Sequence, residues 1–247
     1  MSFRKEIKLI LNRRKSLDFK KMIFSKGAVE MYPKRKISSL YFDNFAKQSH
    51  IDSEEGVLPR KKIRIRTYPN EENKKYLFEK KISSTEGRYK VSKKISLELY
   101  NKMINQGYFD KMYGILWPLL YVDYFREYYL FENFRITIDE NISYKIFKKK
   151  KLKRDTKSVI EIKFTKKQNE DFIINSFTNK LTRFSKYSNG INLMNLWSFL
   201  FNYLKIFLVD FIEWWCPRTD SNRGPIDYKS IALPAELQGH YKENQFL

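Results

Sequence analysis

The stretch from which the fold can be predicted is Arg60-Lys61-Lys62-Ile63-Arg64-Ile65-Arg66-Thr67-Tyr68. Residues with a high preference for β-structure alternate here with charged residues at a period of two, which is typical of a strand. One face of this strand would carry Lys62, Arg64, Arg66 and Tyr68, and the other Ile63 and Ile65. A single strand of this kind is compatible with an ordinary solvent-exposed face.

The same alternation recurs in five further segments, so that six segments pair a charged face with an apolar one. They lie at residues 4–9, 78–82, 124–126, 135–139 and 160–164. An open antiparallel sheet with its charges in water would give this pattern. The charged faces are rich in Arg and in Glu-x-Lys pairs, however, and helix-like stretches between the strands can cover the apolar faces. We therefore predict an α+β fold in which a closed β-barrel has a polar interior and helices packed outside.

The composition favours a polyanionic ligand. The chain has 247 residues, with 49 Lys and Arg against 28 Asp and Glu and a formal net charge of +21. Such a field attracts nucleic acid, phosphate chains or an anionic membrane surface. The single cysteine, Cys216, and the two distant histidines, His50 and His240, exclude a disulfide within the chain and a zinc cluster of these residues. No signal peptide is recognisable, and we expect a cytoplasmic location.

The chain is predicted to have three parts. Residues 1–192 carry the alternating strands and form the main domain. Residues 193–215 are apolar but interrupted by Lys205, Asp210 and Glu213, and their longest uncharged piece is shorter than the ~20 residues that a membrane span needs. This predicts an amphipathic docking or interfacial helix and leaves membrane association and a membrane-protein partner open. Residues 216–247 differ in composition from the rest and are expected to be a disordered, non-native tail.

Nine short motifs in this order resemble the polyphosphate polymerase (VTC) domain, a branch of the triphosphate tunnel metalloenzyme (CYTH-like) superfamily. The resemblance covers residues 2–192. The motifs are Arg4-Lys5-Glu6-Ile7-Lys8, Ser39-Leu40-Tyr41-Phe42-Asp43, Lys62-Ile63-Arg64-Ile65-Arg66-Thr67-Tyr68, Glu79-Lys80-Lys81, Arg88-Tyr89-Lys90, Tyr124-Phe125-Arg126, Arg135-Ile136-Thr137-Ile138-Asp139, Glu161-Ile162-Lys163 and Ser185-Lys186-Tyr187. Arg4 stands where related triphosphatases often have an acidic residue, as is usual in the polymerase branch.

The resemblance implies an antiparallel eight-stranded β-barrel whose lumen is a basic tunnel. In this tunnel the γ-phosphoryl group of ATP would be transferred to a growing inorganic polyphosphate chain. Arg guanidinium groups can contact phosphate oxygens in a bidentate manner, and Lys adds point charges. Arg64, Arg66, Lys81, Arg126 and Lys186 are the residues assigned to catalysis. The residues assigned to binding ATP and polyphosphate are Lys8, Arg64, Arg66, Lys81, Lys90, Tyr124, Arg126, Arg135, Lys163 and Lys186.

The resemblance also implies a divalent cation, Mn²⁺ or Mg²⁺, held by Glu161 and, as a weaker candidate, Glu6. The alternative for Glu6, Glu79 and Glu161 is simple pairing with neighbouring Lys and Arg. Asp139 can equally be an orienting residue behind the ligands.

Three other functions remain open from the sequence. A triphosphatase on the same fold would hydrolyse tripolyphosphate or a nucleoside triphosphate with water as the acceptor. A basic module that binds nucleic acid is disfavoured, because no RNA-binding signature is present and the basic residues alternate singly with acidic partners. The third is a catalytically silent sensor of inorganic or inositol phosphates. The presence of Glu161, the candidate metal ligand, disfavours this alternative.

Overall fold

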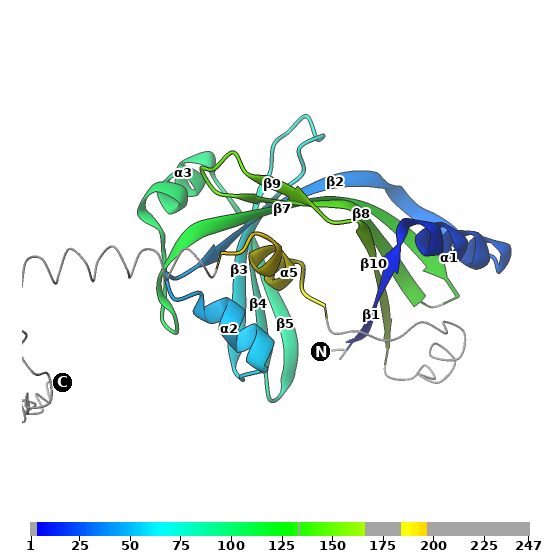
Figure 1. The fold of residues 1–247 in the computed structure, drawn as a ribbon, viewed down its shortest axis with the longest axis horizontal. Coiled ribbons are helices and arrows are strands. Elements are labelled where there is room, and N and C mark those ends of the chain that lie inside the picture. Colours follow the sequence, from blue (N-terminus) through cyan, green and yellow to red (C-terminus); the bar gives the residue numbers. More distant parts are fainter. Residues whose placement is uncertain (1–3, 133, 166–183, 197–247) are drawn as a thin grey trace, which may run out of the picture. The chain divides into compact units, whose positions relative to one another are not determined.

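A computed structural model describes residues 4–132, 134–165 and 184–196 (Figure 1). The chain divides into two compact units, residues 1–201 and 202–247, and every described residue lies in the first. The predicted tail at 216–247 and all but the first four residues of the predicted helix at 193–215 lie outside the described residues. Within the described part, no helix is long and apolar enough to cross a membrane.

One antiparallel sheet dominates this unit, and its main path runs through eight strands in the order β1-β10-β8-β7-β2-β3-β4-β5, with β6 and β9 attached to β7 and β8. The strands are β1 (Arg4–Asn12), β2 (Val29–Asp43), β3 (Arg60–Thr67), β4 (Tyr76–Ser84), β5 (Gly87–Ile95), β6 (Tyr108–Asp110), β7 (Gly114–Phe131), β8 (Phe134–Ile146), β9 (Leu152–Arg154) and β10 (Lys157–Thr165). The eight-stranded antiparallel architecture is therefore confirmed. Between the described residues of β5 and β1 no pairing closes the path into a hydrogen-bonded ring.

Four described helices accompany the sheet: α1 (Arg13–Ser25), α2 (Gln48–Glu55), α3 (Leu97–Gln106) and α5 (Lys186–Leu193). Figure 1 shows α1 over one end of the sheet and α3 over the other. α3 begins after the cap Ser96, whose hydroxyl accepts a hydrogen bond from the Leu99 amide, and ends at Gly107. Gly107 has φ +78, and an added Cβ would lie 3.0 Å from the Leu116 carbonyl oxygen, so glycine fits this stop.

Helices α1 and α3 cover apolar outer faces of the strands, as predicted, whereas α5 packs on the opposite face of the sheet, where its Tyr187 ring stacks on that of Tyr41. Phe19 and Ile23 of α1 pack on Leu9, Ile138 and Ile162. At the other end, Met103 of α3 belongs to a cluster with Leu40, Phe42, Ile63 and Ile65. The opposite side carries the charged residues and, beside them, a third apolar cluster that includes Ile37, Leu120 and Val122 and packs against α5.

Two local features differ from what the sequence pattern predicts. The pattern predicts a first helix capped by Ser16, but the cap is Asn12, whose side chain accepts from the Lys15 amide, and Ser16 is buried inside α1 near Glu140. The pattern also predicts two short strands, at 134–139 and 142–147, but they form the single strand β8, since Asn141 adopts φ 53 without ending the ladder.

Candidate functional site

The strand register places the predicted charged residues on one face of the sheet. Residues directly opposite each other in an antiparallel pair point to the same side. The register pairs Lys8 with Glu161, Arg126 with Asp139, and Arg64 with both Tyr41 and Glu79. We call this side the lumen face; of the predicted site residues it carries Glu6, Lys8, Arg64, Arg66, Lys81, Lys90, Tyr124, Arg126, Arg135, Glu161 and Lys163.

Strands that are far apart along the sheet path face each other across this lumen. Lys81 on β4 is influenced electrostatically by Glu6 on β1 and Glu161 on β10. Lys62 on β3 is influenced by Lys8 on β1. The Phe184–Ser185 segment connects the two sides, because the Lys8 ammonium donates to the Phe184 carbonyl at 3.0 Å and the Lys62 ammonium to the Ser185 hydroxyl at 2.8 Å.

Glu79 organises the cations on one wall of the lumen. It is 2% exposed, and its carboxylate accepts from Arg64 Nε at 2.8 Å and from the Lys90 ammonium at 2.8 Å, with Arg66 3.7 Å away. Arg64 also donates to the Tyr41 hydroxyl at 2.7 Å. Burial alone would raise the pKa of Glu79, but the charges of Arg64 and Arg66 lower it to about 2. Glu79 is therefore an ion-pairing carboxylate that holds these cations in the lumen.

A second buried cluster lies on the opposite wall. Asp139 is fully buried and accepts from Arg126 Nε at 2.5 Å and Nη2 at 2.6 Å, while the Lys186 ammonium lies 2.5 Å from it. Glu161 is 3.3 Å from Arg126 Nη2 and 3.5 Å from Lys186. Burial raises the pKa of both carboxyls, but Arg126 and Lys186 more than offset it, so that both values are lowered.

With this cationic lumen in place, the comparison with protein families is informative. The model of the VTC domain matches residues 3–195. The chain belongs to the VTC domain family. A comparison with curated proteins gave no match.

Solved structures with a similar fold come from several organisms. They include a protein from Pyrococcus horikoshii OT3, with 17% identity over 76% of this chain and 99% of that chain and a TM-score of 0.47. An adenylyl cyclase candidate from Hippeastrum with a dominant triphosphatase activity has 14% identity, covers 76% of this chain and 94% of that chain, and has a TM-score of 0.48. The RNA triphosphatase Pct1 from S. pombe has 11% identity, covers 81% of this chain and 74% of that chain, and has a TM-score of 0.28. The family membership rests on the sequence match.

Tyr124 lies between the two clusters of this VTC domain. Its hydroxyl accepts from Arg66 Nη2 at 3.3 Å, and the charged groups of Arg126 and Lys186 lie 5.4 Å and 5.1 Å from its ring centroid. Burial raises the pKa of this phenol, but the charges of Arg66 and Arg126 outweigh it and lower the pKa. Tyr124 is thus surrounded by cations and can donate its proton to a phosphate oxygen.

Three cationic groups of the lumen retain donor capacity toward a ligand. Lys81 forms no ion pair or hydrogen bond with another described residue, and Lys62 is held only by the Ser185 hydroxyl. Arg66 is 9% exposed, and its buried Nε has no hydrogen-bond partner among the described residues. Burial, together with the charge of Lys8, lowers the pKa of Lys62 to about 7. Burial likewise lowers the pKa of Lys81 to about 8, although Glu161 raises it.

The structure brings most of the predicted site residues together in the lumen, but Arg135 and Lys163 lie away from its buried clusters. Arg135 is exposed and lies beyond the buried cluster, opposite Lys163 in the register. Lys163 is partly exposed, 3.5 Å from Glu161 and 3.9 Å from Glu6. Both therefore lie near the edge of the lumen. The assignment of individual roles to these residues stays a prediction.

Two contributors were missing from the predicted site. Lys62 belongs to the same alternating strand as Arg64 and Arg66, so the period of two already placed it on their face. Asp139 was left as an orienting residue, and its bidentate contact with Arg126 supports that role. The carbonyl of Phe184 and the hydroxyl of Ser185 could not be assigned from a sequence pattern, because they enter the lumen from the segment before α5.

The carboxylates were tested for their fit to a divalent cation. Within residues 4–132, 134–165 and 184–196, no group of three or more His, Cys, Asp and Glu side chains is arranged to hold a metal ion. Burial and the nearby charge of Glu161 raise the pKa of Glu6, but Lys8 and two further lysines outweigh them, so that the pKa is lowered. One or two carboxylates completed by phosphate oxygens and water are sufficient for Mg²⁺ or Mn²⁺. The pair therefore fits a cation that arrives together with a phosphate ligand.

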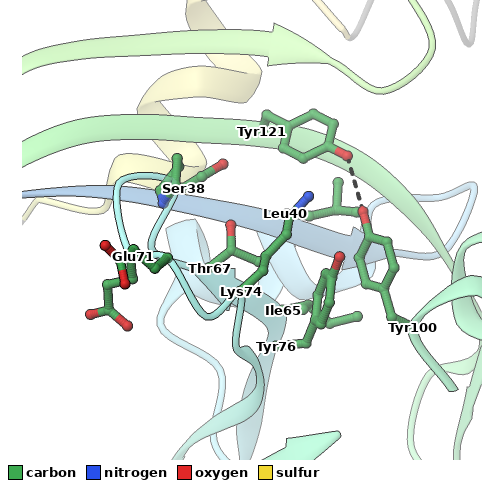
Figure 2. Close-up of a pocket in the computed structure, with 11 residues that line it drawn as sticks. Ser38, Leu40, Ile65, Thr67, Glu71, Lys74, Tyr76, Tyr100 and Tyr121 are labelled. Carbon is green, nitrogen blue, oxygen red and sulfur yellow. Dashed lines mark hydrogen bonds between the residues drawn. The ribbon is translucent and has the colours of Figure 1, made fainter. Parts of the chain in front are cut away.

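A cavity on the other side of the sheet differs in character from the lumen (Figure 2). It measures about 490 Å³ and is lined by Leu40, Ile65 and the rings of Tyr76, Tyr100 and Tyr121. Glu71 and Glu72 lie at this cavity with Lys74, and none of the predicted site residues lines it. Its acidic groups would repel phosphate, so the lumen is the better phosphate site.

Proposed function

We propose that this VTC domain is a metal-dependent polyphosphate polymerase, which transfers the γ-phosphoryl group of ATP to the end of an inorganic polyphosphate chain. The family assignment and the cationic lumen support a tunnel-type domain that handles phosphate compounds. Arg4 at the first motif position supports a polymerase over a hydrolase.

The observation that carries the proposal is the uneven charge of the lumen. Of the residues named above for the lumen, ten are cationic and four are carboxylates. The cations are Lys8, Lys62, Arg64, Arg66, Lys81, Lys90, Arg126, Arg135, Lys163 and Lys186, and the carboxylates are Glu6, Glu79, Asp139 and Glu161. A partly desolvated space with this excess of positive charge is most stable when a polyanion occupies it.

The residues support phosphoryl transfer without a covalent enzyme intermediate. A terminal oxygen of the polyphosphate chain attacks the γ-phosphorus of ATP, the bond from that phosphorus to the β,γ-bridging oxygen breaks, and ADP leaves with the bond electrons. In such transfers the protein mainly positions the groups and balances their charge. Arg64 and Arg66 on one wall, and Arg126 and Lys186 on the other, would hold the phosphates in line.

Glu161 and Glu6 would hold the divalent cation, which when bound neutralises charge on the phosphate oxygens. Lys8 and Lys163, both beside these carboxylates, are the groups that would shift toward the phosphates when a metal takes over the carboxylate oxygens. Mn²⁺ or Mg²⁺ is the chemical class that fits oxygen ligands of this kind.

The proposal is tested by incubating the full chain with ATP and Mn²⁺ or Mg²⁺ and resolving the products by length. We expect long phosphate chains and ADP from the wild type, and their loss in Arg64→Ala and in Glu161→Ala. Val91→Ala, at a half-exposed position of β5 away from the cation clusters, is the matched control. Circular dichroism has to show that all variants keep the fold.

The outcome also separates the proposal from its main alternative. Free phosphate without chains would mean that water is the acceptor and that the domain is a triphosphatase. Synthesis that persists in Arg64→Ala would contradict the assignment of the reaction to the lumen.

A further inference from the structure

An exposed apolar strip lies at the end of the sheet where the described chain stops. Phe45 is 78% exposed, Phe109 67% and Ile115 54%, and the half-buried ring of Trp117 neighbours that of Phe45. We call these four residues the apolar strip. Large apolar side chains that are exposed singly are common, but a contiguous exposed group indicates an interaction surface.

The contacts show that the strip is continuous. Phe109 and Ile115 are direct register partners on β6 and β7, so their side chains share a face. Ile115 and Trp117 are two residues apart on β7 and point to the same side. The Trp117 ring lies 6.3 Å from that of Phe45, in the loop between β2 and α2.

A lysine block lies at the same end of the sheet as this strip. The block is Lys148–Lys151, whose four side chains are exposed. It follows Phe147, whose amide donates to the Leu119 carbonyl at 2.9 Å. Leu119 is two residues from Trp117, so the register of β7 and β8 places basic and apolar side chains at the same end of the sheet. In the lumen most cations form an ion pair with a carboxylate, whereas no salt bridge involves this block among the described residues.

The described chain also ends at this place. The Lys47 ammonium donates to the carbonyl of Leu196 at 2.6 Å, and Lys47 is two residues from Phe45. In the sequence, residues 197–215 follow directly and carry only three charges, Lys205, Asp210 and Glu213, among many aromatic and aliphatic residues. An apolar stretch of the chain therefore starts beside an exposed apolar strip.

We propose that this end of the domain docks on the surface of an anionic lipid bilayer. The apolar strip would enter the boundary between headgroups and acyl chains, and the lysine block would contact anionic headgroups. A lipid surface fits better than a second copy of the chain, because the block and the net charge of +21 would repel each other in a homodimer. This inference does not depend on the proposed polymerase activity.

The test is co-sedimentation of the full chain with vesicles of phosphatidylcholine, with and without phosphatidylglycerol. The wild type is expected to bind the vesicles that contain phosphatidylglycerol. Phe45→Asp combined with Phe109→Asp should weaken this binding by about tenfold or more, since each ring loses its burial in the bilayer. Val91→Asp, an equally apolar and half-exposed position on β5, is the control and should bind like the wild type.

The charge contribution is tested separately. Lys149→Glu with Lys150→Glu should weaken binding by about tenfold or more, because each lysine near an anionic surface contributes roughly 1 kcal/mol. Lys21→Glu with Lys26→Glu makes the same charge change on exposed positions of α1 and its end, and should have a clearly smaller effect.

Several results would overturn the inference. One is a wild type that does not bind these vesicles. Another is binding that survives the strip and lysine variants unchanged, which would mean that another part of the chain binds the lipid. A third is a concentration-dependent dimer that Phe45→Asp abolishes, since a second copy would then cover the strip.

Discussion

The lowered pKa values of Lys62 and Lys81 predict that the affinity for triphosphate depends on pH above neutrality. The pKa of Lys62 is about 7 and that of Lys81 about 8, against an ordinary value of 10.5. Below these values both ammonium groups are charged and ready to bind an anion. Above them the empty lumen holds neutral amines, and a bound polyanion must recruit a proton to each.

The magnitude follows from proton linkage. A bound triphosphate raises both pKa values, so affinity falls by up to tenfold per pH unit for each lysine between its free and its bound pKa. From about pH 7.5 to about pH 9, Lys62 contributes about one and a half decades and Lys81 about one. The affinity should therefore decrease by at least about a hundredfold over this interval.

The assay is isothermal titration with the β,γ-methylene analogue of ATP in the absence of metal, in two buffers that differ in ionisation enthalpy. Proton uptake on binding should appear above about pH 7.5 as a difference in heat between the buffers. The matched variant is Lys62→Arg with Lys81→Arg, in which guanidinium groups stay charged throughout. It should bind at about pH 9 with much of its affinity retained. Equal pH slopes for this variant and the wild type would refute the assignment of the slope to the two lysines.

Three further predictions concern the framework of the lumen. Glu79→Gln should lower the free energy of unfolding, measured in urea, by about 3 kcal/mol at neutral pH. The pKa of Glu79 is lowered from 4.5 to about 2 in the folded protein. The stability difference is therefore present above about pH 4.5 and should vanish as the pH falls toward 2. Gly190→Ala should destabilise the packing of α5 by about 1–3 kcal/mol, since the new Cβ would lie 2.5 Å from Tyr144; an unchanged melting temperature would contradict this contact. Asp139→Asn should cost about 3–5 kcal/mol, because Arg126 would lose its buried carboxylate, and thermal unfolding with and without triphosphate separates lost stability from lost binding.

The alternation of residues was sufficient to predict the sheet and its charged side. Ile63 and Ile65 lie in the apolar cluster under α3, and Arg64 and Arg66 lie on the lumen face, as a period of two requires. Strand lengths were harder to predict. Val29–Asp43 continues across Pro33, which interrupts a strand in most contexts, because the register with β7 shifts there and relaxes the pairing.

The partners of each lumen residue could not be predicted, since they depend on the register between distant strands. Glu79 pairs with Arg64 through one antiparallel register, 15 residues apart in the sequence. Lys186 meets Asp139 only because α5 packs against the sheet, which is a tertiary contact without a local pattern. The order of the motifs in the sequence indicated which residues belong to the site, and the structure shows which of them contact one another.

The carboxylates in a lumen that favours phosphate have a physical reason. Cations packed this closely would repel each other and lose their orientation without counter-charges. Glu79, which is 2% exposed, pairs with Arg64, Arg66 and Lys90 and so fixes the positions of these cations. The N–H groups that bind Glu79 are then no longer available to bind a phosphate. A phosphate ligand therefore has to use the remaining donors, which include Arg66 Nε and Lys81. The carboxylates thus decide where in the lumen a phosphate is held, and the unpaired donors decide how strongly.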